Sequence, residues 1–317
     1  MPQRPRATVL LGAQRFDPTL GAVMAAHGVD GPVATITAGW QERESDDQEL
    51  HEHLGRRSVN LHLYERAGDV FRSDPELHAA HRKRQEVLRH KQDFYRIRLE
   101  HELEAARVIR TRAAPPDILA EEHAASIASI RELDAWHLAQ CARVRDAFDE
   151  KWRPFERKAI VRHRREIEQV LAGCPALAIA GGHVAVLLNR LMFFGLSELL
   201  DGQTVFAWTA GAMAVCERVV LFHDAPAQGP GAAEVLDNGL GLVPNVVALP
   251  HPETRLMLED SGRVATMARR FAPASCIALP ARTHVTWADD RLTLDAGVTV
   301  LCADGTPSTT PPEPVFA

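Results

Sequence analysis

The stretch VFAWTAGAM, residues 205–213, passes directly from an apolar strand into a helix. A nucleophile elbow needs such a turn, with small residues two before and two after the central one, because the tight corner leaves no room for Cβ contacts. Ala207 and Gly211 occupy these places around Thr209. The Thr209 side chain would then lie at a helix N-terminus, where free N–H groups favour developing negative charge. Strand–helix turns that serve only packing can show the same pattern.

Short apolar runs alternate with helical segments on both sides of this turn. The runs that we interpret as strands are 7–12, 32–38, 58–63, 176–182, 204–208 and 218–224. This rhythm predicts an α/β fold with a mostly parallel, doubly wound sheet. Asp17 should cap a helix that reaches His27, with Pro18 in its first turn. From residue 276 onward, short strands with turn signals and no helix between them predict antiparallel additions at the sheet edge.

A long segment without glycine interrupts this pattern. Residues 69–172 contain no glycine and are rich in Ala, Leu, Glu and Arg, a composition typical of long helices. Ala113-Ala114-Pro115-Pro116 must turn the chain, and Pro154 should kink or restart a helix. We therefore predict a coiled-coil-like α-helical hairpin, or a three-helix unit, over residues 73–172. The α/β core would comprise residues 1–72 and 173–317.

Composition limits the classes of function. The chain of 317 residues has a net charge of −6, so its charge balance does not favour a nucleic-acid partner. The five cysteines never form a CxxC pair, which indicates reduced thiols in the cytoplasm rather than disulfides or a zinc site. No apolar run approaches the length of a bilayer span, so we expect no membrane partner. We expect neither a metal nor a cofactor.

The sequence around the elbow resembles the peptidase S51 family. Residues 176–215, ALAIAGGHVAVLLNRLMFFGLSELLDGQTVFAWTAGAMAV, are similar to the family's Gly-Gly loop, Leu-rich helix and G-x-S-A-G-A nucleophile motif. Residues 239–256, GLGLVPNVVALPHPETRL, contain a histidine in the family's Pro-His context. The family comprises serine-dependent aspartyl dipeptidases and cyanophycinases of the class I glutamine amidotransferase-like superfold. The resemblance implies a flavodoxin-like sheet, and the helical insertion has no counterpart in it.

The resemblance also implies a catalytic triad. Thr209 stands at the position of the nucleophile and His251 at that of the general base. Asp224 is the expected orienting acid, and Glu217 is the alternative. The base would take the hydroxyl proton, while the acid would hold the imidazole tautomer and stabilise the imidazolium.

Further site residues follow from the same resemblance. The oxyanion hole would consist of backbone N–H groups, from Ala210 and from the Gly181-Gly182 loop. Substrate would be bound by Arg255, His183 and Trp208, with Arg255 meeting a substrate carboxylate. His183 is also a candidate for a helix cap.

The sequence departs from the family at the nucleophile, where Thr209 replaces serine, and at Ala207, which replaces the first glycine of the motif. Threonine keeps the hydroxyl, but a β-branched residue at positive φ costs about 1–3 kcal/mol. The leading hypothesis is a hydrolase that cleaves a small peptide or isopeptide bond of the aspartyl type through an acyl-enzyme on Thr209. The alternative is an inactive, ligand-binding or assembly scaffold. A homo-oligomer could form through residues 76–172. An amidotransferase is disfavoured, since those elbows carry cysteine.

Overall fold

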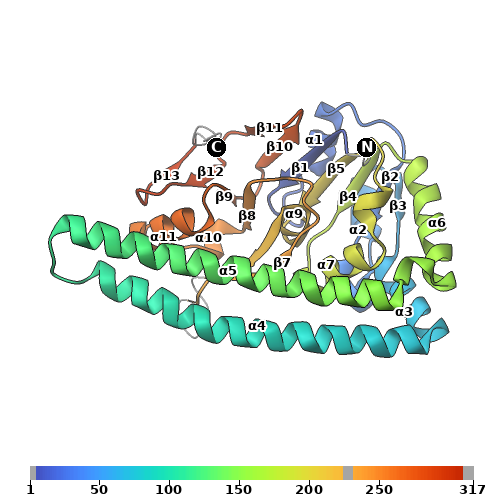
Figure 1. Ribbon diagram of the computed structural model, residues 1–317. Helices are drawn as coiled ribbons and strands as arrows, with labels where there is room; N and C mark the ends of the chain where they lie inside the picture. Colours follow the sequence, from blue (N-terminus) through green and yellow to red (C-terminus); the bar gives the residue numbers. More distant parts are fainter. Residues whose placement is uncertain (1–4, 224–230, 310–317) are drawn as a thin grey trace.

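A seven-stranded sheet forms the centre of the computed structural model, which describes residues 5–223 and 231–309 (Figure 1). The strand order is β11–β10–β1–β5–β4–β2–β3. Strands β1, β5, β4, β2 and β3 run parallel, whereas β10 pairs antiparallel with β1, and β11 with β10. The strands are β1 (Ala7–Leu11), β2 (Val33–Ile36), β3 (Ser58–Asn60), β4 (Ala176–Ile179), β5 (Thr204–Trp208), β10 (His284–Ala288) and β11 (Arg291–Leu294). This arrangement confirms the predicted α/β class and its antiparallel C-terminal edge.

Two smaller sheets contain strands that we had predicted to belong to the main sheet. Strands β8 (Val246–Pro250), β9 (Ser275–Leu279), β12 (Thr299–Leu301) and β13 (Pro307–Ser308) form a separate sheet. In it β9 runs parallel to β8, because helix α11 (Ser261–Phe271) connects the two strands as a crossover. Strand β6 (Arg218–Leu221) also lies outside the main sheet and pairs antiparallel with β7 (Glu234–Asn238).

Helices cover both faces of the main sheet, because successive strand side chains point to opposite faces. Val9 and Leu11 join a buried cluster with helix α1 (Leu20–Ala26) and with Leu50 of α2 (Gln48–His53). Leu10 joins a larger cluster on the other face, with α3 (Leu63–Ser73), α7 (Val184–Phe193) and α9 (Ala210–Val215). The remaining short helices are η1 (Ala38–Arg43), η2 (Pro154–Glu156), α8 (Leu196–Leu199) and α10 (Pro252–Arg255).

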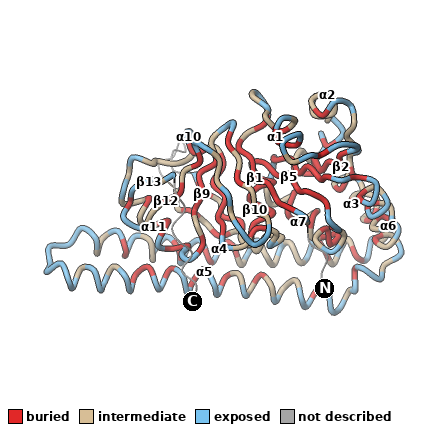
Figure 2. Tube along the Cα trace, turned by 90° about the horizontal axis from the view of Figure 1, so that it is seen from above, coloured by how far each residue is buried: buried red, intermediate tan, exposed pale blue. Residues whose placement is uncertain are grey.

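The glycine-free segment forms a helical hairpin, as predicted. Helix α4 (Pro75–Arg110) and helix α5 (Pro116–Trp152) lie side by side and antiparallel, and α6 (Lys158–Ala172) returns the chain to β4. The tip of the hairpin projects beyond the sheets, and its tube is largely exposed (Figures 1 and 2). None of the described helices combines the length and the apolarity that crossing a bilayer requires.

A buried polar network fastens the hairpin to the core. Arg270 of α11 donates from Nε to Asp134 Oδ2 of α5 at 2.7 Å and from its guanidinium to the Tyr95 hydroxyl of α4 at 2.9 Å. Tyr95 in turn donates to Asp134 Oδ1 at 2.7 Å. All three side chains are buried, with exposed fractions of 3% or less. The charge pair is therefore shielded from water and held by several hydrogen bonds at once.

The predicted cap of the first helix is wrong. Helix α1 begins at Leu20, and its first N–H groups are satisfied by Gln14, whose Oε1 accepts from the backbone N–H groups of Thr19 and Leu20 at 2.8 Å each. Asp17 instead pairs with Arg282. The buried side chain of Gln14, in the loop before the helix, therefore takes the role that we had assigned to a cap at the helix start.

Candidate active site

Thr209 lies at a sharp corner between β5 and α9. Its backbone has φ 51° and ψ −118°, a conformation that L-residues rarely adopt and that is especially strained for a β-branched side chain. The strand ends at Trp208 and the helix begins at Ala210, so no residue other than Thr209 absorbs the change of direction. The side chain is half-buried at the carboxyl end of a parallel strand, where α/β sheets bind their ligands.

Glycines let the elbow and a neighbouring loop approach each other. A Cβ on Gly211 would lie 2.4 Å from the Ile179 carbonyl oxygen, which explains the small residue two positions after Thr209. A Cβ on Gly181 would lie only 1.6 Å from Thr209 Oγ1 and 3.3 Å from the Ala210 backbone nitrogen. The Thr209 hydroxyl therefore lies directly over the backbone of Gly181. Gly181 thus lies next to both the Thr209 hydroxyl and the Ala210 nitrogen.

A cavity of about 660 Å³ opens above Thr209. Thr209, Trp208, Gly181 and His251 all border it. Its other walls come from the loops that follow β1, β2 and β4, from the start of α1 and from α2: Ala13, Gln14, Arg15, Phe16, Pro18, Leu20, Gly39, Trp40, Arg43, Asp46, Glu49, Leu50, His53 and Gly182. The cavity thus brings the predicted nucleophile and the predicted base to one site.

His251 reaches the cavity from the end of β8. It adopts a left-handed conformation, φ 59° and ψ 47°, directly before α10. Partial burial lowers the pKa of the His251 imidazole, and the neighbouring Arg255 lowers it further, while Glu253 opposes the shift. A neutral ring at pH 7 is the form that a general base requires. Within the described residues, no hydrogen bond joins the ring to the Thr209 hydroxyl.

The two candidate acids are not placed equally well. Asp224 lies outside the described residues. Glu217 accepts the backbone N–H of Asn245 at 3.0 Å, and Asn245 precedes β8 whereas His251 follows it. At about 3.3 Å per residue, the two ends of this stretch are about 20 Å apart. Glu217 therefore does not orient His251, and its role is to hold the entry to β8.

The three predicted substrate-binding residues have different environments. Trp208 borders the cavity and is 7% exposed. His183 is exposed and accepts the Val186 backbone N–H through Nδ1 at 3.3 Å, so it caps α7, the alternative role considered from the sequence. Arg255 ends the four-residue helix α10 and is not among the described residues that border the cavity.

The sequence interpretation missed the amino-terminal wall of the cavity. Gln14 and Phe16 follow β1, Trp40 follows β2, and Leu50 and His53 lie on α2. The carboxyl ends of neighbouring parallel strands meet at one edge of a sheet. That rule, applied to the predicted strands 7–12 and 32–38, would have indicated these loops.

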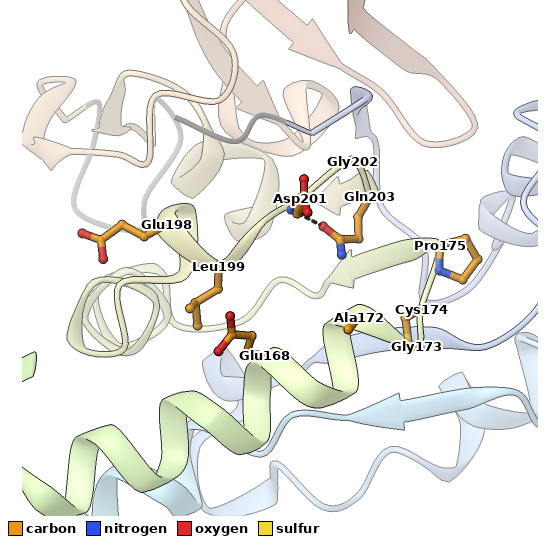
Figure 3. A pocket seen from close by; sticks show the side chains of 10 residues that line it. All are labelled: Glu168, Ala172, Gly173, Cys174, Pro175, Glu198, Leu199, Asp201, Gly202 and Gln203. Carbon is orange, nitrogen blue, oxygen red and sulfur yellow. Dashed lines mark hydrogen bonds between the residues drawn. The ribbon is translucent and has the colours of Figure 1, made fainter. Parts of the chain in front are cut away.

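A second hollow and one cluster of side chains that could ligate a metal lie outside this cavity. A hollow of about 550 Å³ lies at the opposite edge of the sheet, where residues 172–175 and 201–203 precede β4 and β5 (Figure 3).

The carboxylates of Glu44 and Glu65 and the His62 imidazole lie within 4.8 Å of one another, a spacing that suits a metal ion. Both Glu44 oxygens already accept backbone N–H groups of α3, at 2.9 Å each, so this carboxylate caps the helix.

Comparisons with known proteins show only distant similarity. No family model and no curated protein matches the sequence. A solved peptidase from an acI-B1 Actinobacterium is 13% identical, and the match covers 96% of this chain and 93% of that chain at a TM-score of 0.44. A candidate peptidase E from Listeria monocytogenes EGD-e is 11% identical, covering 92% of this chain and 98% of that chain at a TM-score of 0.43. The reaction must therefore be argued from the residues of the cavity.

Proposed function

We propose that the protein is a hydrolase that cleaves an amide bond of a small peptide or isopeptide through an acyl-enzyme on Thr209. The observation that supports the proposal is the strained elbow at Thr209, a residue that borders the same cavity as His251. Backbone strain of about 1–3 kcal/mol persists only where the surrounding structure enforces it, and it clusters at active sites.

The reaction proceeds in two halves. His251 accepts the Thr209 hydroxyl proton as the oxygen attacks the carbonyl carbon, and the imidazolium then gives that proton to the departing amine. The acyl group remains as an ester on Thr209. In the second half His251 takes a proton from water, whose oxygen attacks the ester, and Thr209 recovers its hydrogen as the carboxylic acid leaves. Water and amide are consumed, and an acid and an amine are released.

The oxyanion of each tetrahedral intermediate needs preorganised donors. The Ala210 N–H and an N–H of the Gly181-Gly182 loop are the proposed pair, because Gly181 lies next to both the Thr209 hydroxyl and the Ala210 nitrogen. One such donor is typically worth about 10²–10³ in rate. Asp224 remains the proposed acid for orienting His251, and Asp224→Asn should slow turnover without preventing substrate binding.

The test is turnover of a dipeptide panel by the purified full chain, with capture of the acyl-enzyme by intact-mass spectrometry. Thr209→Ala and His251→Ala should each abolish turnover, whereas Thr209→Ser should retain or increase it, because serine lacks the methyl group that restricts χ1. His183→Ala is the matched control, since His183 is an exposed helix cap. If neither the natural chain nor Thr209→Ser hydrolyses any dipeptide of the panel, the proposed hydrolase activity is rejected.

The alternative is a non-catalytic scaffold, and one observation favours it. Phe94 and Ile97 of α4 are 66% and 55% exposed, and their spacing of three residues places both apolar side chains on one side of the helix. Under this alternative, and under the proposed self-association through residues 76–172, replacing both with glutamate should lower the molar mass measured by light scattering. A mass unchanged by the substitutions removes this surface as the site of assembly.

A further inference from the structure

The charges around the cavity offer an acidic substrate side chain no buried cation among the described residues. The cavity is bordered by two arginines, Arg15 and Arg43, and by two carboxylates, from Asp46 and Glu49, so these four side chains carry no net charge. Arg43 is already paired with Asp46, Nε to Oδ2 at 3.0 Å. Arg15 is exposed and lies over the Phe16 ring, 5.3 Å from its centroid.

Of the two histidines that border the cavity, one is already engaged and the other is the proposed base. His53 Nε2 accepts the Gly21 backbone N–H at 3.2 Å, so this nitrogen is already occupied by α1. Burial lowers the pKa of His251, which favours its neutral form. Arg255, the predicted partner of a substrate carboxylate, is not among the described residues that border the cavity. Arg15 is the lining cation without a carboxylate partner among the described residues, and it is exposed at the rim, where water screens its attraction for an aspartyl side chain.

Apolar side chains contribute much of the wall of the same cavity. Leu20 and Trp208 are buried, and Trp40 and Leu50 are partly buried against the same hydrophobic cluster. Phe16 is 92% exposed at the rim. Exposed aromatic surface that adjoins a core cluster inside a cavity is suited to cover an apolar ligand group. The wall begins next to Thr209, since Trp208 directly precedes it.

We propose that the acyl group of the substrate carries a bulky apolar or aromatic side chain, which packs on Trp40, Leu50 and Trp208. This inference rests on the proposed function and replaces the aspartyl preference that the family resemblance implied. Full burial of a phenylalanine or leucine side chain favours binding by about tenfold to a hundredfold over an exposed one. Discrimination of that size is expected between Phe-X or Leu-X and Asp-X dipeptides that share the same leaving residue.

The experiment measures kcat/KM for matched Phe-Ala, Leu-Ala, Asp-Ala and β-Asp-Ala dipeptides with the full chain, and their Kd for the Thr209→Ala variant by calorimetry. We expect Phe-Ala and Leu-Ala to lead Asp-Ala by at least about tenfold in both quantities. Tighter binding of the apolar dipeptides without any turnover supports the specificity and rejects the hydrolase. Equal or better binding of the aspartyl dipeptides, or binding of none, overturns the specificity.

A charge placed on the wall provides the matched variant. Leu50→Arg adds a cation to the cavity and should reduce the Phe-Ala preference about tenfold while raising the affinity for Asp-Ala. Ile118→Arg adds the same charge to the exposed start of α5 and should leave the preference unchanged. Trp40→Ala should weaken Phe-Ala binding and leave Asp-Ala binding as it is. An unchanged preference in both Leu50→Arg and Trp40→Ala would show that the acyl side chain lies elsewhere.

Discussion

Thr209 is a β-branched residue in a backbone conformation that glycine adopts more readily. The pattern of small residues around it was sufficient to predict the corner, because a tight turn excludes Cβ atoms whatever the rest of the chain does. The hydroxyl position was not predictable in the same way. It depends on the Gly181 backbone, which arrives from a different strand.

Thr209→Gly should stabilise the protein. Glycine adopts φ 51° and ψ −118° without side-chain strain, a gain of about 1–3 kcal/mol, of which about 0.5–1 kcal/mol is offset by the larger entropy of glycine in the unfolded chain. Urea denaturation should therefore show a higher midpoint with an unchanged slope, together with complete loss of turnover. A lower midpoint would mean that the threonine contacts outweigh the strain.

The pH dependence of turnover should report His251. Because burial and Arg255 lower its pKa, the acid limb of kcat/KM should lie below the ordinary histidine value of about 6.5. Arg255→Gln removes a repelling cation and should move this limb to higher pH, and Glu253→Gln should move it to lower pH. Two shifts in the same direction would contradict the assignment. The folded state binds this proton more weakly than the unfolded chain, so acid below pH 6.5 also destabilises the fold.

The elements of the core were largely predictable, and their partners were not. Apolar runs of the right length located β1, β2, β4 and β5 to within three residues at each end. Strand β6 has the same apolar character, yet it pairs with β7 outside the main sheet. Periodicity reports whether a segment is buried, but pairing is decided by tertiary contacts. Helix α11, which makes β9 parallel to β8, was missed, although Val264, Met267, Ala268 and Phe271 follow helical spacing.

Gly181→Ala should be strongly destabilising and inactivating. Its Cβ would meet Thr209 Oγ1 at 1.6 Å, so either the loop or the elbow must move, at a cost of at least about 1–3 kcal/mol for overpacking. Gly173→Ala is the control, because the nearest atom to its Cβ is 3.6 Å away and its φ is −89°. Thermal unfolding compares the two variants. Equal midpoints would show that the loop yields without cost.

On the scale of the whole molecule, the insertion is part of the folded core. Its long helices were predictable from composition, since glycine is absent and helix-forming residues are dense. The fastening of α4 and α5 to α11 was not, because Arg270, Asp134 and Tyr95 are 39 to 175 residues apart in the chain. Nothing in their local sequence distinguishes them from surface residues.

Asp134→Ala should destabilise the protein by about 3–5 kcal/mol, because it leaves the buried Arg270 guanidinium without its counter-charge. The double variant Asp134→Leu with Arg270→Met removes both charges and should recover much of the loss. In the double variant, as in the natural chain, two signals should change together on denaturation. These are far-ultraviolet circular dichroism, which reports the helices, and tryptophan fluorescence. Separate transitions in the natural chain would show that the hairpin unfolds on its own.

The position of β1 also bears on how the chain matures during translation. Both neighbours of β1, β5 and β10, are synthesised long after it, at residues 204–208 and 284–288. Until the ribosome has extended past the entire hairpin, the first strand of the nascent polypeptide has neither of its edges covered. The two long helices consist of local contacts and form quickly, so the newly made chain would acquire its arm before the sheet that the arm is fastened to.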